Sequence, residues 1–169
     1  MKRNKNIDFV VVGGGHAGVE AAHIISKLGF VVGFITMDKN GIGRMSCNPA
    51  IGGVAKGQLV RELDLLGGVM GKLADMSGLQ YKMLNTSKGR SVWSPRAQVD
   101  KRVYESLCAD LIFNLKNIVI IEGEVVSVDI IKNKTCGVFL RDGTYIPAQS
   151  VVVTCGTFLS GTCLLYTSP

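Results

Sequence analysis

The hydrophobic pattern at the start of the chain predicts a strand, a helix and a second strand. Residues 7–12 (IDFVVV) form a short, nearly all-apolar run, which is typical of a strand covered on both faces in a parallel sheet. Glycines end that run, and from His16 apolar residues recur at helical spacing until Gly29 closes the segment. Residues 31–35 form a second apolar run. The pattern therefore predicts a βαβ unit with a right-handed crossover.

The middle of the chain predicts long loops and three helices. Residues 37–55 carry several turn-forming residues and are predicted to form a long ordered loop, and loops of that length in compact domains are usually functional. The spacing of Leu59, Leu63 and Leu66 predicts one apolar helix face. Residues 69–76 are predicted to form a further short helix. A basic segment is predicted as a loop, followed by a helix over residues 97–115.

The last third of the chain returns to strands. Residues 118–121 and 151–154 are continuous apolar runs, as expected of buried parallel strands. Between them, shorter runs predict a small antiparallel meander, with an Asp-Gly turn before its last strand: residues 125–131, 136–140 and 145–146. The predicted fold is α/β and Rossmann-like, with a parallel sheet and a small antiparallel meander.

A glycine-rich turn is the first candidate site. The motif GxGxxG follows a predicted strand and opens a predicted helix, where amides at the positive helix end can meet a pyrophosphate. Asp38 lies 20 residues after the motif, where an acid can hold a ribose hydroxyl, although Thr36 competes for that contact. A purely structural glycine turn is the alternative. The candidate cofactor-binding residues of the turn are Gly13, Gly14, Gly15, His16, Ala17 and Gly18.

A second glycine site favours FAD over a nicotinamide cofactor. The run at residues 151–153 ends in Thr154-Cys155-Gly156, after a meander. In flavoproteins a later strand of this kind brings its backbone close to FAD, so Gly156 is a further candidate binding residue. A plain core strand followed by a turn is the alternative.

The five cysteines are an odd number without a CxxC pair, which argues against a disulfide framework and a zinc site. Cys47 lies in the predicted loop, where a thiol near a flavin could act as nucleophile or proton donor. A free cysteine packed as a small hydrophobic residue is the other reading. Cys108, Cys136 and Cys155 lie on apolar elements and are expected in the core. The two histidines of the chain have no third ligand, so no metal site is predicted.

Composition and charge narrow the class of protein. Charged residues make up 19% of the chain, and the mean hydropathy is +0.29. These values leave little polar surface for a free-standing domain, so they indicate that the chain is part of a larger protein. No stretch is long enough to span a membrane, and no signal peptide is read. The odd number of cysteines without a CxxC pair fits a reducing cytoplasm best. Of the net charge of +6, residues 82–102 hold +5, around Trp93. That segment could bind nucleic-acid phosphates, or it could be a solvated loop.

Five motifs, in this order and spacing, closely resemble the MnmG family, also called glucose-inhibited division protein A. They are GGGHAG (13–18), MSCNPAIGG (45–53), LNTSKG (84–89), SPRAQVDK (94–101) and TCGTFL (154–159). This chain has Arg90 and Trp93 where the family usually has Pro and Arg. The resemblance implies the N-terminal part of an FAD-binding domain, residues 1–161, incomplete at its C-terminus. Residues 162–169 do not resemble the family and are expected to be a truncation scar or artefactual tail.

The resemblance implies an enzyme that installs a carboxymethylaminomethyl-type group on C5 of the wobble uridine of tRNA. FAD is the implied cofactor, and methylenetetrahydrofolate and NADH are the implied co-substrates. The implied partner is a GTPase, MnmE, and the full-length protein is expected to be a homodimer. Val125 matches the position whose backbone lies near adenine, and Cys47 a cysteine with a catalytic role. Two alternatives stay open: a related folate- and FAD-dependent tRNA methyltransferase, and a flavin- or RNA-binding module without turnover.

Overall fold

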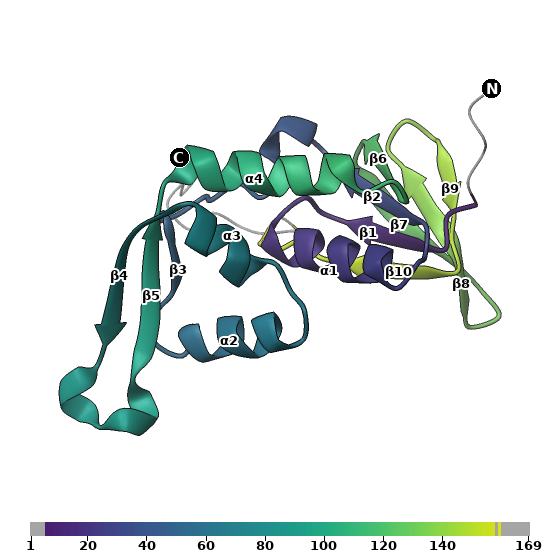
Figure 1. Ribbon diagram of the computed structural model, residues 1–169. Coiled ribbons are helices and arrows are strands. Elements are labelled where there is room, and N and C mark those ends of the chain that lie inside the picture. Colours follow the sequence, from purple (N-terminus) through teal and green to yellow (C-terminus); the bar gives the residue numbers. More distant parts are fainter. Residues whose placement is uncertain (1–5, 158, 160–169) are drawn as a thin grey trace, which may run out of the picture.

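The computed structural model describes residues 6–157 and 159 (Figure 1), so the predicted tail at 162–169 lies outside the described residues. A four-stranded parallel sheet is its centre, in the order β10-β1-β2-β6. The predicted βαβ unit and the later parallel strands are confirmed. The four strands are β1 (Phe9–Val12), β2 (Val32–Thr36), β6 (Ile118–Glu122) and β10 (Ser150–Val153), and helix α1 (His16–Lys27) connects the first two.

Both faces of the sheet are covered, which explains why its strands are mostly apolar and carry polar residues only at their ends. On one face Val11 packs against α1 and against α4 (Lys101–Asn114). On the other face Val10 and Val12 pack against the predicted meander, which consists of β7 (Val125–Ile131), β8 (Lys134–Leu140) and β9 (Tyr145–Pro147). Burial of each such valine contributes about 1.5–3 kcal/mol. The α/β fold with a parallel sheet and an antiparallel meander is therefore as predicted.

The basic segment is not the continuous loop that its composition predicts. Strands β4 (Gly78–Leu84) and β5 (Ser94–Val99) pair antiparallel, and β3 (Ala50–Gly52) pairs with the other edge of β5. Short 3-10 turns at Thr86–Lys88 and Arg90–Val92 join the hairpin. A further 3-10 turn, Lys39–Gly41, and β3 lie within the predicted loop 37–55. Figure 1 shows the hairpin extending away from the parallel sheet at the left of the molecule.

Two predicted helices differ from the structure. Helix α4 begins at Lys101 rather than at residue 97, because residues 97–99 belong to β5 and the Asp100 carboxylate caps the helix by accepting from the amides of Arg102 and Val103. Helix α2 (Gly57–Leu65) leaves Leu59 and Leu66 exposed, so its predicted apolar face is not buried against the rest of the described chain. Helix α3 (Met70–Met76) forms as predicted.

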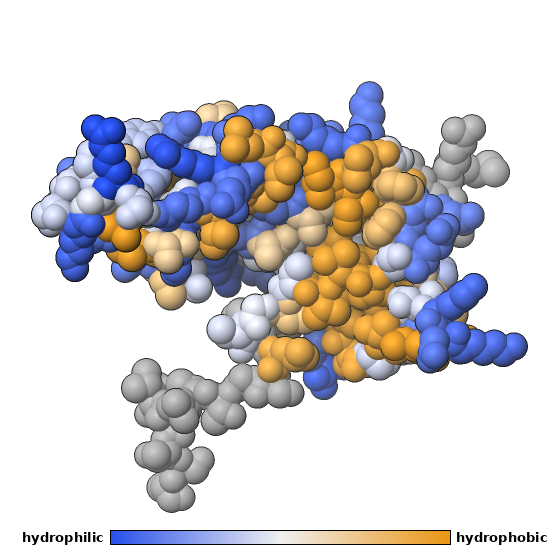
Figure 2. Space-filling view, turned by 90° about the horizontal axis from the view of Figure 1, so that it is seen from below, coloured by the Kyte–Doolittle hydropathy of each residue, from blue (hydrophilic) through white to orange (hydrophobic). Residues whose placement is uncertain are grey.

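The surface is divided between apolar and polar regions. Figure 2 shows apolar residues gathered over the side of the molecule that holds the parallel sheet, whereas the hairpin end is mostly hydrophilic. The exposed large apolar side chains near the sheet include Leu28, Phe30 and Val153. Among the described residues, no helix has the length and apolar character that a membrane crossing requires.

Candidate dinucleotide-binding site

The glycine-rich turn joins β1 to α1 and is held by both neighbouring strands. The Gly13 amide donates to the Ile35 carbonyl of β2 at 2.8 Å. Gly13 has φ +110°, and a Cβ there would lie 2.5 Å from the carbonyl oxygen of Thr154, just after β10. A Cβ at Gly18 would collide with the Gly13 carbonyl oxygen. The fold itself therefore requires glycine at positions 13 and 18.

Gly15 differs from its neighbours because nothing in the described chain requires it. It has φ −76° and ψ −173°, which other residues adopt readily, and a Cβ there would meet no atom within 4 Å. It is the N-cap of α1, no side chain caps the helix, and its first turn holds no acid. The amides of His16 and Ala17 have no partner within the helix, and the helix dipole makes this end positive. Open space beside such amides fits a pyrophosphate.

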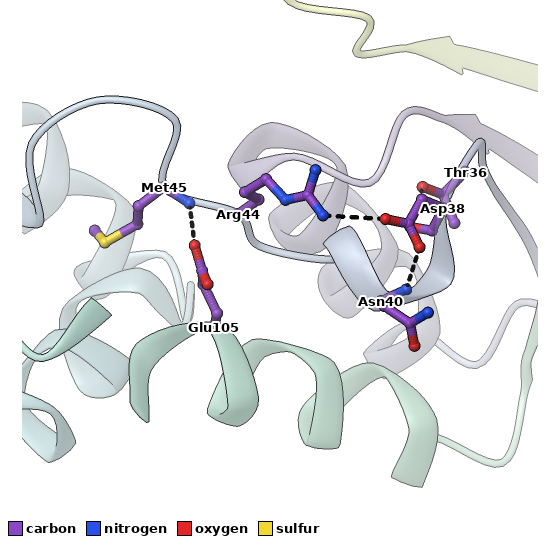
Figure 3. Close-up of polar contacts among 6 residues, drawn as sticks. All are labelled: Thr36, Asp38, Asn40, Arg44, Met45 and Glu105. Atoms are coloured by element: carbon purple, nitrogen blue, oxygen red, sulfur yellow. Dashed lines mark hydrogen bonds and ion pairs between the residues drawn. The ribbon is translucent and has the colours of Figure 1, made fainter. Parts of the chain in front are cut away.

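Asp38 lies just beyond the end of β2, beside the turn (Figure 3). Its carboxylate accepts from the Asn40 amide at 2.9 Å and from the Arg44 guanidinium at 3.0 Å. The Thr36 side chain is buried, lies against Gly14, and donates to the Asp38 carbonyl at 3.1 Å. Because the Thr36 hydroxyl is used in this way, the half-exposed Asp38 carboxylate is the more accessible acceptor for a ribose hydroxyl.

The other predicted cofactor-binding residues lie at the same edge of the sheet. The Thr154 amide donates to the Val12 carbonyl at the end of β1, at 2.8 Å. Gly156 follows Thr154 by two residues, so it lies just beyond the end of β10, on that side of the glycine-rich turn. On the other side, the Gly123 amide donates to the Thr36 carbonyl at 2.9 Å, and the half-buried Val125 follows two residues later. The carboxyl ends of parallel strands are where α/β sheets bind ligands. The structure thus gathers the predicted cofactor residues around one edge.

Cys47 is exposed on the loop between the 3-10 turn at residues 39–41 and β3. Two contacts fix this loop: the Gly43 amide donates to the Gly14 carbonyl at 2.8 Å, and the Met45 amide donates to Glu105 Oε1 of α4 at 2.8 Å (Figure 3). The loop is therefore tied to the glycine turn four residues before the thiol, and to a helix two residues before it.

The other described thiols and the histidine side chains differ in burial. Cys108 is buried in the core, as predicted, and burial raises the pKa of its thiol to about 11, so the thiol stays protonated at neutral pH. Cys136 and Cys155 are only half-buried, contrary to the prediction of core positions, because they lie on the outer meander and just beyond the sheet edge. Burial lowers the pKa of His16, and its buried Nδ1 has no partner in the described part of the chain. Within residues 6–157 and 159, no three candidate ligands gather as a metal site.

Arg44 and Glu105 were not predicted from the sequence. Arg44 lies six residues after Asp38, within a loop whose path no local pattern defines. Glu105 meets Met45 across 60 residues. A negative residue on a helix has many ordinary roles, so only the folded structure identifies these contacts.

Comparison with known proteins identifies close relatives. The family model described as glucose inhibited division protein A matches residues 8–168. The chain is 46% identical over 162 residues to the tRNA uridine 5-carboxymethylaminomethyl modification enzyme MnmG of Endomicrobium trichonymphae, covering 96% of this chain and 27% of that relative. The Aquifex aeolicus GidA structure in its form II crystal has TM-score 0.88 and 46% identity, covering 94% of this chain and 26% of that one.

A more distant structure shares the fold alone. PqsL of Pseudomonas aeruginosa, described as a probable FAD-dependent monooxygenase, has TM-score 0.55 and 14% identity, with 86% of this chain and 41% of that chain covered. The chain spans about a quarter of the length of the curated relatives that it matches.

Proposed function

The chain belongs to the glucose inhibited division protein A family, and from this premise we propose that it forms the FAD-binding part of an enzyme that modifies uridine in tRNA. Its relatives are named for that modification, and the resemblance of the five motifs agrees with those names. Because the chain covers about a quarter of these relatives, the activity belongs to a protein of family length that contains it.

The observation that carries the proposal is the open space at Gly15. The fold accounts for glycine at positions 13 and 18, but it does not account for glycine at 15. A bound pyrophosphate does, because it must approach the amides that open α1. Proximity of β10 to the turn favours FAD, which when bound supplies the redox chemistry.

Each remaining site residue has a proposed role. Asp38 holds a ribose hydroxyl, the backbone at Val125 lies beside the adenine, and Gly156 lets the chain pass close to FAD. Cys47 provides a thiolate that acts as nucleophile or proton donor, which suits its exposed position on a fixed loop.

The finer reaction follows from the family resemblance. A one-carbon unit from methylenetetrahydrofolate is transferred to C5 of the wobble uridine and an amine completes the group, while NADH supplies electrons. A GTPase, MnmE, is the proposed partner, and the family-length protein is a cytoplasmic homodimer. The comparisons favour this function over the related tRNA methyltransferase, since the relative with 46% identity carries the modification-enzyme name.

Reconstitution tests the proposal. A protein of family length containing this chain is mixed with the GTPase, GTP, methylenetetrahydrofolate, NADH, glycine or ammonium, and unmodified tRNA, and the nucleosides are analysed by mass spectrometry. We expect bound FAD and a C5-substituted wobble uridine. A protein that folds without binding FAD, or that methylates a uridine elsewhere in the tRNA, would overturn the proposal.

A further inference from the structure

The hairpin sheet β3-β5-β4 has two different faces. On one side a cleft of about 730 Å³ separates the sheet from α2 and α3, and Tyr81 and Met83 help to line it. The opposite side has a hollow of about 220 Å³ lined by alternate residues of two strands. These are Gln80, Lys82 and Leu84 of β4 and Arg96 and Gln98 of β5. Alternation along strands places these five side chains on one face.

Two cations oppose each other directly within this hollow. Lys82 pairs with Arg96 in the antiparallel register, so their Cβ atoms lie about 4.5–5.5 Å apart, and like charges at that position destabilise a sheet. The residue opposite Arg96 on the other neighbouring strand is Gly52, which offers no compensating side chain. None of the residues that line this hollow is acidic. The same two residues also contribute to the lining of the larger cleft, which contains Asp64 and Asp75, but within the described chain neither cation has an ion pair. Arg96 is also half-buried, which makes its unpaired charge more costly.

Three other arginines of the described chain have partners. Arg44 pairs with Asp38, and Arg141 pairs with Glu124. At the hairpin tip the Arg90 guanidinium lies over the Trp93 ring, 5.8 Å from its centroid. The pair of Lys82 and Arg96 thus combines opposed like charges, no ion pair among the described residues, and a hollow whose lining holds no acid, an arrangement that a bound anion would stabilise.

We propose that Lys82 and Arg96, with the amides of Gln80 and Gln98, form an oxyanion site that holds a backbone phosphate of RNA. A guanidinium can donate two parallel hydrogen bonds to a phosphate, an ammonium adds a point charge, and side-chain amides donate further hydrogen bonds. The choice of RNA rests on the proposed function. It also rests on the hairpin tip, where Trp93 is 37% exposed beside Arg90, because RNA bases stack both on aromatic rings and on guanidinium planes.

A charge reversal separates the binding role from a structural role. In the family-length protein with FAD bound, Lys82→Glu replaces the repulsion with an ion pair to Arg96, so the unfolding midpoint should stay unchanged or rise. The same change removes the phosphate site. Lys88→Glu is the control, because it makes the same change in net charge on the same hairpin, in the 3-10 turn outside the hollow.

The readout is affinity for a synthetic anticodon stem–loop RNA at several salt concentrations. We expect Lys82→Glu to weaken binding about tenfold beyond the control and to make the slope of log affinity on log salt shallower by about one unit. Equal losses in the two variants, or an unaltered slope in Lys82→Glu while the parent binds RNA, would overturn the site alone. A parent that carries FAD but binds no RNA would overturn the proposed function and the RNA site together.

A second measurement distinguishes RNA from free phosphate. Acylation of lysines is followed by peptide mass spectrometry, with Lys88 as the internal reference. The stem–loop should protect Lys82, whereas millimolar inorganic phosphate should not. Protection by inorganic phosphate with no protection by RNA would assign the hollow to a small free anion and overturn the proposal.

Discussion

Substitution of Gly15 by valine separates what the fold requires from what the ligand requires. Valine tolerates φ −76° and ψ −173°, and its Cβ would meet no atom of the described chain within 4 Å. We therefore expect the FAD-free protein to lose no more than about 1 kcal/mol of unfolding free energy, through a poorer N-cap. With FAD, the same side chain displaces phosphate from the amides of His16 and Ala17. Each hydrogen bond to a charged group is worth about 1.5–3 kcal/mol, so losing two raises the Kd by roughly two to four orders of magnitude.

The assay measures two quantities in the family-length protein. Flavin absorbance gives the ratio of FAD to protein after purification, and urea unfolding of the FAD-free form gives stability. Gly18→Ala is the matched control, because its Cβ collides with the Gly13 carbonyl oxygen and should reduce both quantities. A Gly15→Val protein that is folded and retains the parent's FAD would refute the assignment of this turn.

Three further predictions concern other residues. Cys47→Ser should leave FAD content and stability close to the parent's while strongly lowering uridine modification. As a control, Cys108→Ser should lower the unfolding free energy by about 1–3 kcal/mol, because it buries a hydroxyl in the core. Uridine modification by Cys47→Ser at the parent's rate would make that thiol structural. Asp38→Asn should weaken FAD binding about tenfold and free Arg44, which titration of the FAD-free protein with FAD can measure, and an unchanged affinity would remove Asp38 from the ribose site. Burial lowers the pKa of the His23 imidazole, so the unfolded chain binds a proton at this residue more tightly than the folded protein does. The neutral imidazole therefore costs the fold nothing above about pH 6.5, and the free energy of unfolding decreases as the pH falls below that value. Urea unfolding at pH 7.5 and 5.5 should show a smaller decrease in that free energy for His23→Gln than for the parent.

The sequence predicted the parts of the fold that local patterns determine. Residues 9–12 and 32–36 lie in strands buried between two layers, so apolar runs reveal them without further context. The hairpin was missed because its cations, Lys82 and Arg96, lie on its solvent face. The segment was interpreted from its net charge, and the alternation of side chains that is typical of a strand was overlooked. The α2 leucines were misplaced because helical spacing predicts an apolar face without predicting what covers it.

For the candidate site too, the sequence predicted what neighbouring residues determine and missed what distant residues determine. The turn from Gly13 to Gly18 is a contiguous motif, and its strand and helix context could be predicted from neighbouring residues. The contact of Glu105 with Met45 joins residues 60 apart and leaves no local pattern. The roles of Asp38 and Cys47 stay predictions, although the structure places both on the loop that is tied to the turn.

The contact between Thr154 and Val12 has a consequence for biosynthesis. The Thr154 hydroxyl donates to the Val12 carbonyl at 2.7 Å across 142 residues. At about 5–20 residues per second, a ribosome takes roughly 7–28 s to synthesise that interval. Until then β1 lacks a neighbour on one edge, and the turn that follows it lacks one of its walls. Chaperones acting on the nascent chain would therefore meet an open, strongly apolar strand, and the walls of the turn are complete only once β10 has left the exit tunnel.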